Sequence, residues 1–322
     1  MIIQGLDEAV LMGQPRAVAK AITMVETEDE EAARLIARLR PMARRGHVVG
    51  LTGSPGAGKS TLVGELAKEF RSRGKTVGII AIDPSSPFSG GAFLGDRVRM
   101  PELASDPGVF IRSMASRGRS GGIAAAVEDA TLILKASGKD IVLVETVGVG
   151  QGELDIASVV QTVVVVLTPG MGDDIQSLKA GILEVADIYV VNKADLPGAD
   201  VVARSLQALA HQTASSWTRP IIMTSSVSHE GVPDLAEAIE SHKRYLSSLR
   251  TAGAPEIHRA IQAILSQAGR QILRELESSV DPRSLEQLAS EVVAGKIDPR
   301  EAAEKVVRLY FEAHLASTPR VW

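Results

Sequence analysis

The chain has 322 residues, of which 45% are hydrophobic, and this is enough for one large α/β domain with additional helices. Its 39 acidic and 35 basic residues give a formal net charge of −4 and are spread along the chain, which argues against a nucleic-acid partner or an anionic membrane surface. Cysteine is absent, which excludes disulfides and thiolate metal sites. The longest apolar stretch, residues 163–167, is far too short to cross a bilayer, and no targeting segment is evident, so we expect a cytoplasmic protein.

Residues 1–46 predict a helical N-terminal extension. Thr27 and Glu30 have the spacing of a capping box, in which a hydroxyl and a carboxylate satisfy the first N–H groups of a helix. The amphipathic stretch 32–39 follows them directly. We therefore expect a helix that begins at Thr27.

Residues 47–250 alternate β-branched runs with helical patterns, which is typical of βαβ units. The predicted fold is α/β, with a mostly parallel central sheet covered by helices on both faces and flanked by the helical extensions. Several strands are nearly continuous runs of Val and Ile, as expected when both faces are covered. The loop 84–101 is long for such a unit, which indicates a functional role. The predicted strands are 47–52, 76–82, 108–112, 140–146, 162–168, 187–192 and 220–225.

Residues 251–322 predict a helical C-terminal module. Asp281-Pro282 and Asp298-Pro299 each place an N-cap aspartate before a proline at the first helical position. The module either packs back on the central domain or serves as a dimerisation arm. We favour the arm, because an apolar stripe begins after the α/β pattern ends at Ala254-Pro255 and extends the chain beyond a complete sheet. That stripe consists of Ile257, Ile261, Leu265, Ala268, Ile272 and Leu276.

Residues 53–60 match the phosphate-binding pattern GxxxxGK(S/T) and follow a predicted strand. The glycines let successive backbone N–H groups point inward at the phosphates of a nucleoside triphosphate. Lys59 then reaches the β- and γ-phosphates, Ser60 offers a hydroxyl to Mg²⁺, and a helix predicted over 61–73 turns its positive end to the phosphates. The predicted nucleotide-binding residues here are Gly53, Ser54, Pro55, Gly56, Ala57, Gly58, Lys59, Ser60 and Thr61.

The tetrapeptide Asn192-Lys193-Ala194-Asp195 ends another predicted strand, where open α/β sheets bind ligands. The Asp195 carboxylate can accept hydrogen bonds from the ring N–H and the exocyclic amine of guanine, whereas adenine presents an unprotonated ring nitrogen. Each charge-assisted bond contributes roughly 1.5–3 kcal/mol, so adenine should bind about 100-fold or more weakly. We expect Asn192 to brace the loop and Lys193 to lie over the base. Backbone N–H groups would complete the base pocket at Ser225, Ser226 and Val227.

Three acidic residues lie where a metal-phosphate switch needs them, namely Asp83, Asp96 and Glu145. Magnesium on a triphosphate takes only one or two carboxylates directly, so some of them act through water or in one nucleotide state. Gly148 and Gln151 belong to a glycine-hinged segment after Glu145, as expected of a loop that responds to the γ-phosphate. Val149 stands where Ras-like proteins place a water-orienting glutamine, which predicts slow intrinsic hydrolysis.

These motifs together resemble the G-protein chaperones of adenosylcobalamin-dependent methylmalonyl-CoA mutase, the MeaB-like P-loop GTPases, some of which were once labelled ArgK-type transport kinases. The resemblance runs through GSPGAGKST at 53–61, AIDPSSPFSGGAFLGDRVRM at 81–100 and VETVGVGQGE at 144–153, and continues through PGMGDDIQSLKAGILEVAD at 169–187 and NKAD at 192–195. It covers the whole central domain, and the second, third and fourth segments are specific to this group. Phe88 departs from the polar residue expected in the first switch loop.

The resemblance implies a homodimeric GTPase, joined by its C-terminal helices, that gates cofactor delivery to the mutase and protects it. Its ligands would be GTP or GDP with Mg²⁺ held by Ser60, Asp83, Asp96 and Glu145. Arg99 resembles a charge-stabilising or switch residue, and segment 172–179 resembles a third switch that contacts the mutase. The implied catalytic residues are Lys59, Asp96, Arg99 and Glu145, and the implied switch or partner residues are Gly148, Gln151, Asp173, Gln176 and Lys179.

Two other functions stay open from the residues. A nickel-type metal-insertion GTPase shares the general domain but normally brings Cys and His ligands, whereas this chain has no Cys and its six His are scattered singly. A small-molecule or transport-protein kinase would need a pocket for the phosphoryl acceptor, and nothing in the sequence marks one.

Overall fold

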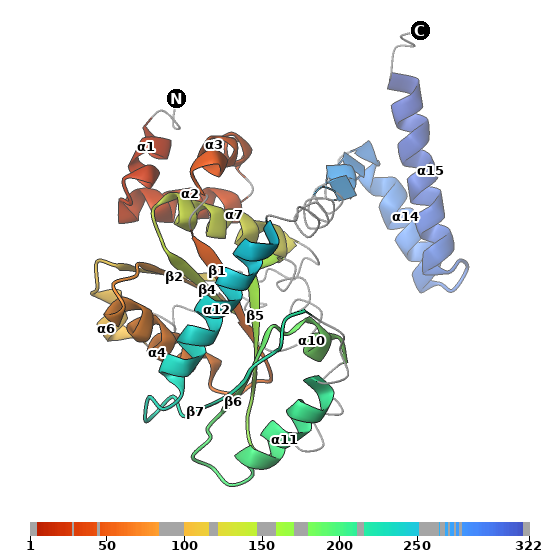
Figure 1. The fold of residues 1–322 in the computed structure, drawn as a ribbon. Coiled ribbons are helices and arrows are strands. Elements are labelled where there is room, and N and C mark those ends of the chain that lie inside the picture. The colour runs from red at the N-terminus through yellow and green to blue at the C-terminus, as the bar shows by residue number, and fades with distance from the viewer. Residues whose placement is uncertain are drawn as a thin grey trace. The chain divides into compact units, whose positions relative to one another are not determined.

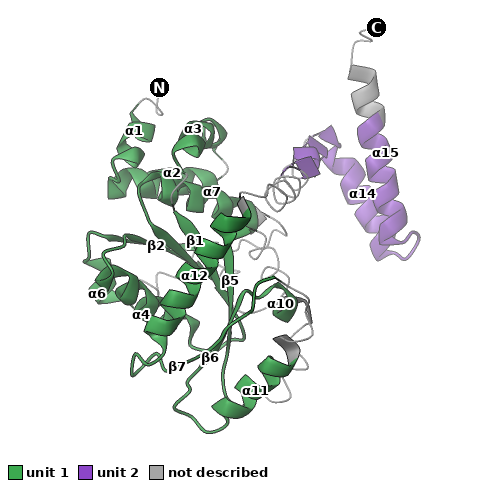
Figure 2. Ribbon diagram, viewed as in Figure 1, with its two compact units in different colours: residues 1–251 green, residues 252–322 purple. Residues whose placement is uncertain are grey.

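A computed structural model of the chain describes residues 5–27, 29–43, 46–83, 100–115, 122–146, 159–170, 180–210, 216–250, 264, 268–269, 271–273, 275–276 and 279–317. The chain divides into two compact units, residues 1–251 and residues 252–322 (Figure 2). The first unit contains the sheet, and the second is helical.

Seven parallel strands form the sheet of the first unit, in the order β3-β2-β4-β1-β5-β6-β7 (Figure 1). The predicted strands are confirmed to within three residues at either end. β1 lies at the centre, between β4 and β5, so the chain reverses its direction of winding there. Ligands of open α/β sheets bind at such a switch point, outside the carboxyl ends of the strands. The strands are β1 (His47–Thr52), β2 (Val77–Asp83), β3 (Val109–Ala115), β4 (Ile141–Glu145), β5 (Thr162–Leu167), β6 (Ile188–Asn192) and β7 (Ile221–Thr224).

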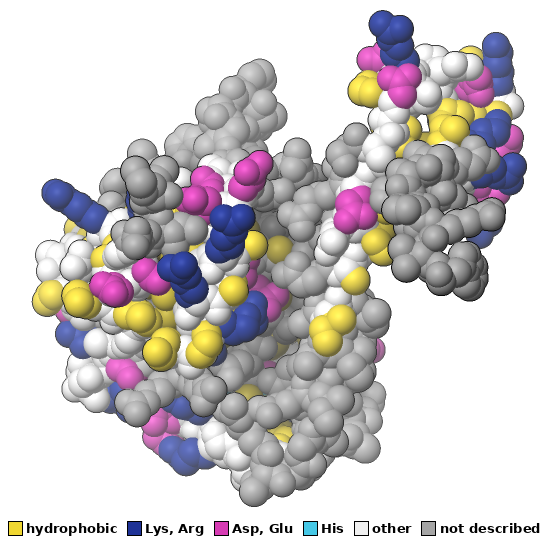
Figure 3. All heavy atoms as spheres, turned by 90° about the horizontal axis from the view of Figure 1, so that it is seen from above, with side chains coloured by type: hydrophobic (Ala, Val, Ile, Leu, Met, Phe, Trp, Pro, Cys, Tyr) yellow, Lys and Arg dark blue, Asp and Glu magenta, His cyan; other side chains and the backbone are white. Residues whose placement is uncertain are grey.

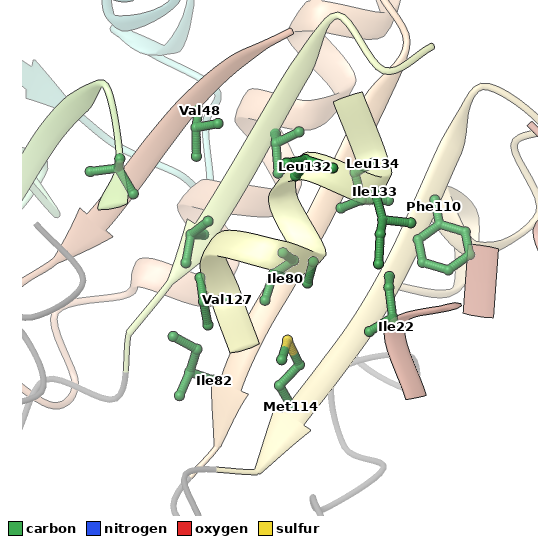
Figure 4. Packing of buried hydrophobic residues seen from close by; sticks show 14 of the residues in the cluster. Ile22, Val48, Ile80, Ile82, Phe110, Met114, Val127, Leu132, Ile133 and Leu134 are labelled. Carbon is green, nitrogen blue, oxygen red and sulfur yellow. The ribbon is translucent and has the colours of Figure 1, made fainter. Parts of the chain in front are cut away.

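Helices cover both faces of the sheet, as predicted. Successive side chains of a strand point to opposite faces, so Val48 joins one core while Val49 and Leu51 join the other. One core contains α4 (Lys59–Ser72), α6 (Pro101–Ala104) and α12 (Val232–Arg250). The other contains α7 (Gly122–Ala136), α10 (Ala180–Val185) and α11 (Ala199–Ala210) together with the N-terminal helices. Figure 4 shows this second core, where Val127 of α7 lies beside Ile80 of β2 and Ile133 of α7 lies beside Phe110 of β3.

The N-terminal segment folds as α1 (Leu6–Leu11), α2 (Pro15–Glu26), α3 (Ala32–Leu39) and the short 3₁₀ helix η1 (Arg40–Met42). The predicted capping box at Thr27 and Glu30 is wrong. Thr27 follows the last residue of α2, and its hydroxyl donates to the carbonyl of Thr23 at 3.0 Å. The carboxylate of Asp29 accepts the N–H of Glu31 at 2.8 Å, just before α3. Asp29 therefore stabilises the turn before α3, and Glu31, the N-cap residue of α3, has no side-chain capping bond.

Two helices of the second unit begin at the predicted aspartate-proline pairs. The Asp281 carboxylate accepts from the N–H of Arg283 at the start of α14 (Pro282–Val293). The Asp298 carboxylate accepts from the N–H groups of Arg300 at 2.7 Å and Glu301 at 2.8 Å at the start of α15 (Pro299–Ser317). Both helices therefore have N-cap aspartates followed by proline.

Surface charge in the described residues is mixed. Figure 3 shows basic and acidic side chains side by side on the face it presents, together with exposed hydrophobic side chains. Of the helices that the structure describes, none combines the length and the apolar character that crossing a bilayer requires.

A buried polar network lies at the amino ends of β1 and β5, on the side of the sheet away from the switch point. The Thr162 hydroxyl is 2.7 Å from Nε2 of His47 and 2.8 Å from Nδ1 of His242, and Nε2 of His242 is 3.4 Å from the Asp187 carboxylate. A carboxylate only accepts, and a neutral imidazole has one N–H. His242 therefore donates to Asp187 and accepts from Thr162, whose oxygen accepts from His47.

This network predicts a loss of stability in mild acid. Burial is the main cause that lowers the pKa of His47 from 6.5 to about 3, and the positive charges of Lys243 and Lys135 reinforce it. Between these two values the unfolded chain binds a proton at this position that the folded chain does not, so stability falls as the pH drops below 6.5, by at most about 1.4 kcal/mol per pH unit. Urea denaturation at pH 7.5 and pH 5 should show a loss larger by about 1–2 kcal/mol in the wild type than in His47→Gln. Equal losses in the two proteins would contradict the assignment.

Candidate functional site

The phosphate loop, residues 53–60, connects β1 to α4 at the carboxyl ends of the strands. Gly53, Gly56 and Gly58 have φ values of 139°, 76° and 83°, a region that favours glycine. A Cβ on Gly53 would lie 2.0 Å from the carbonyl oxygen of Val166 in β5, and real contacts are never so short. The loop therefore depends on glycine both for its backbone conformation and for its close approach to the neighbouring strand.

Two ammonium groups contact the carbonyl oxygens of this loop. The Lys59 Nζ donates to Gly53 at 2.6 Å and to Ser54 at 3.1 Å, and the side chain is buried. The Lys193 Nζ donates to Gly56 at 2.9 Å from the end of β6. Positive charge and the N-terminus of α4 thus converge on the loop, an arrangement suited to a polyanion.

A hydroxyl and a carboxylate lie together beside the loop. The Ser60 Oγ donates to the Glu145 Oε1 at 2.5 Å, and the Glu145 side chain is buried. Glu145 ends β4 and pairs in register with Leu51 of β1, which places it next to the loop that follows β1. Asp83 ends β2, in which Ala81 pairs with Glu145, so its backbone lies at the same edge of the sheet.

Asn192, the last residue of β6, connects the phosphate loop to the end of β7 and the turn that follows it. We call its three hydrogen bonds the asparagine brace. Its Nδ2 donates to the carbonyl of Ala57 at 2.9 Å. Its Oδ1 accepts from the hydroxyls of Thr224 at 3.0 Å and Ser226 at 2.9 Å. The side chain is buried, and a Cβ on Gly58 would lie 2.5 Å from its Nδ2. The predicted bracing contact is therefore present in the structure.

The remaining predicted base-side residues border this brace. Asp195 is exposed in the turn after β6, where Lys193 has a left-handed φ of 57° and Asn192 is buried. Ser225 and Ser226 are buried after β7, whereas Val227 is 95% exposed. The N–H of Ser225 donates to the carbonyl of Glu230 at 3.0 Å, which closes a short turn.

The structure thus brings together the predicted residues 53–61, Glu145, Asn192, Lys193, Asp195 and 225–227 at one edge of the sheet, with the backbone of Asp83. The other predicted site residues lie outside the described residues, namely Asp96, Arg99, Gly148, Gln151, Asp173, Gln176 and Lys179. Within the described part of the chain, no three His, Asp or Glu side chains are grouped so that they could hold a metal ion.

Sequence reasoning missed two contributors to this edge. Thr224 is the last residue of β7 and bonds Asn192, yet nothing in the sequence distinguishes it from other strand threonines. His229 is one of the six histidines that are scattered singly in the sequence, and it contacts Glu65 and Glu69 of α4. The spacing of these two glutamates, four residues apart on one helix face, was the available sequence signal.

Comparisons with known proteins agree with this geometry. Residues 18–280 match the family model described as methylmalonyl-CoA mutase-associated GTPase MeaB. A Pyrococcus horikoshii protein that carries a GTPase name is 44% identical, and the match covers 95% of this chain and 97% of that protein. The mouse methylmalonic aciduria type A homolog, mitochondrial, is 31% identical over 97% of this chain and 80% of its own length. A crystal structure titled LAO/AO transport system kinase has the same fold, with a TM-score of 0.70 at 24% identity over 95% of this chain and 96% of that one.

The asparagine brace predicts a graded loss of stability. Asn192→Ala leaves a buried carbonyl and two hydroxyls without their partner and should lower the free energy of unfolding by about 2–3 kcal/mol. Ser226→Ala removes one of the three bonds and should cost about 1 kcal/mol. Urea denaturation of both variants checks this order. Equal stability of Asn192→Ala and the wild type would show that the brace does not hold the loop.

Proposed function

The chain belongs to the family of methylmalonyl-CoA mutase-associated GTPases called MeaB, and on that premise we propose that it is a GTP-hydrolysing chaperone of an adenosylcobalamin-dependent acyl-CoA mutase. It would gate delivery of the cofactor to methylmalonyl-CoA mutase or a related enzyme and protect that enzyme from inactivation. The observation that carries the proposal is the asparagine brace, which joins a phosphate loop to an NKxD turn in one site.

Guanine recognition is assigned to the turn after β6 and the turn after β7. The exposed Asp195 carboxylate can accept from both hydrogen-bond donors of guanine, the ring N–H and the exocyclic amine, and adenine has neither donor at these positions. Ser225, Ser226 and Val227, which follow β7, would contact the base from the other side. The buried Asn192 sets the separation between these turns and the phosphate loop.

Phosphate chemistry is assigned to the other half of the site. Lys59 would neutralise the β- and γ-phosphates, and its burial strengthens that electrostatic effect. Hard oxygen ligands suit Mg²⁺, and the hydroxyl of Ser60 lies against the carboxylate of Glu145, so we assign the metal to Ser60, Asp83, Asp96 and Glu145. Bound Mg²⁺ would neutralise charge that develops between the β- and γ-phosphates. Arg99 is assigned a charge-stabilising or switch role.

We assign contact with the partner enzyme to the glycine-rich segments that follow β4 and β5, near the expected position of the γ-phosphate. Gly148 and Gln151 follow Glu145 in sequence, and Asp173, Gln176 and Lys179 follow β5. Both β4 and β5 flank β1, so segments that leave their carboxyl ends start beside the phosphate loop. A partner that binds these segments would sense the nucleotide by linkage.

The proposed domains are the N-terminal extension 1–46, the GTPase domain 47–250 and the C-terminal dimerisation module 251–322. The support for dimerisation is the large apolar side chains that the second unit leaves exposed, since such surfaces are typical of interfaces. Among its described residues these are Ile264, Ile272, Leu273, Val293, Val307, Leu309 and Phe311.

The base assignment predicts a change of nucleotide preference. In Asp195→Asn the amide can donate to the extra carbonyl of xanthine, which the carboxylate cannot. The variant should lose affinity for GTP by about 100-fold and gain affinity for xanthosine triphosphate. Competition binding with both nucleotides measures the two effects. Unchanged GTP affinity would remove the guanine assignment.

The partner assignment predicts nucleotide-dependent affinity. Calorimetry with the cognate mutase should give affinities that differ by about 5- to 150-fold between a GTP analogue and GDP, the usual scale of such coupling. The double variant Gln176→Ala/Lys179→Ala should reduce this difference while its own nucleotide binding stays nearly intact. Equal affinities with both nucleotides would contradict gating, and absence of binding would contradict the proposed partner.

A further inference from the structure

The turn between β7 and α12 carries a histidine that contacts α4, the helix that begins in the phosphate loop. His229 has a φ of 63°, in the left-handed region that histidine and asparagine tolerate better than most residues. Its Nδ1 is 2.9 Å from the Glu65 carboxylate, and its Nε2 is 3.5 Å from the Glu69 carboxylate. Both ring nitrogens therefore face carboxylates, one helical turn apart on α4. We call these two contacts the histidine tie.

Both contacts of the histidine tie can be hydrogen bonds at once only when the ring is protonated. A neutral imidazole has a single N–H and can donate to one carboxylate, whereas an imidazolium donates from both nitrogens. Burial alone would raise the pKa of Glu65, but hydrogen bonds from His229 and Lys68 outweigh it and the pKa lies below its ordinary value. The other charged groups around the ring are Lys68, bonded to Glu65 and Glu102, Arg73, bonded to Glu69 and Glu237, and the adjacent Glu230.

The tie acts on a turn whose shape is closely constrained. Ser225 and Glu230 are bonded through their backbones across the turn, and Ser226 bonds Asn192. Gly231, with a φ of 69°, ends the turn, where a Cβ would lie 1.9 Å from the carbonyl oxygen of Met223. Fixing His229 therefore restricts the backbone of residues 225–227 as well.

We propose that His229 is a positioning residue whose imidazolium holds the base-side turn 225–230 against α4, so that guanine-nucleotide binding strengthens when the ring is protonated. The proposal rests on the proposed function, because that function assigns the turn to the base. The asparagine brace joins the phosphate and base halves through buried groups, and the histidine tie joins the same halves at a partly exposed position. The tie therefore modulates affinity and is not required for the site to form.

The effect should be modest and dependent on pH. Histidine is the side chain whose ordinary pKa, about 6.5, lies closest to neutrality. Partly exposed ion pairs contribute up to about 1 kcal/mol, so breaking the tie should weaken binding by roughly 2- to 5-fold. As the pH rises from 6 to 8, the wild type should lose this advantage over a variant that cannot form the tie.

Calorimetric titration of GDP at pH 6 and pH 8 tests the proposal with three variants. His229→Asn tolerates the left-handed backbone and carries no charge, and His229→Arg places a permanent cation against the same glutamates. Asp200→Asn removes an exposed carboxylate on α11, paired with Arg204, and controls for a change in net charge. Because each variant is compared with the wild type at the same pH, titration of the GDP phosphate cancels.

The wild type should bind GDP roughly 2- to 5-fold more tightly than His229→Asn at pH 6 and equally at pH 8. His229→Arg should bind more tightly than His229→Asn at both pH values, and Asp200→Asn should follow the wild type. A ratio of wild-type to His229→Asn affinity that is the same at both pH values overturns the histidine tie. If the wild type binds no GDP at either pH, the proposed function itself fails, and the tie fails with it.

Discussion

The site depends on one buried amide. Asn192 donates to the phosphate loop and accepts from the hydroxyls of Thr224, at the end of β7, and Ser226, just after it. It does so from the end of β6, a strand that is buried on both faces. A buried polar side chain is costly unless its hydrogen bonds are made, so the phosphate loop and the base-side turns hold each other in one arrangement. Gly58 is tied to the same constraint, since a Cβ there would collide with the amide.

The sheet supplies the frame for this constraint. Parallel strands covered on both faces bring all their carboxyl ends to one edge, and the order of the strands places β1 at the switch point. Polar groups lie at both edges of the sheet and have different roles there. At the amino edge Thr162 links the buried rings of His47 and His242 through hydrogen bonds. At the carboxyl edge Lys59, Lys193 and Asp195 place their charges around a glycine-rich loop.

Patterns local in sequence predicted much of this structure. The strands, the phosphate loop with α4, and the aspartate caps of α14 and α15 all depend on short segments. Predictions were poorer where several polar side chains of one turn compete for the same role, and where side chains distant in sequence meet. Thr27 and Glu30 had capping-box spacing, but Thr27 ends α2 and the Asp29 carboxylate accepts the N–H of Glu31 in the turn before α3. Single histidines gave no sequence pattern, yet His229 meets α4 across 164 positions and His242 meets β5 across 80. Such contacts follow from the fold and not from the neighbouring residues.

The central claim is that the asparagine brace joins the phosphate loop and the base-side turns into one site for GTP. The most direct test compares the rates of phosphate release from GTP and from ATP. Lys59→Ala is the negative control, because it removes the ammonium group that the phosphate loop places near the phosphates. The wild type should turn over GTP slowly and ATP about 100-fold less efficiently, and Lys59→Ala should release phosphate from neither. Equal turnover of GTP and ATP, or turnover that survives Lys59→Ala, would contradict the account.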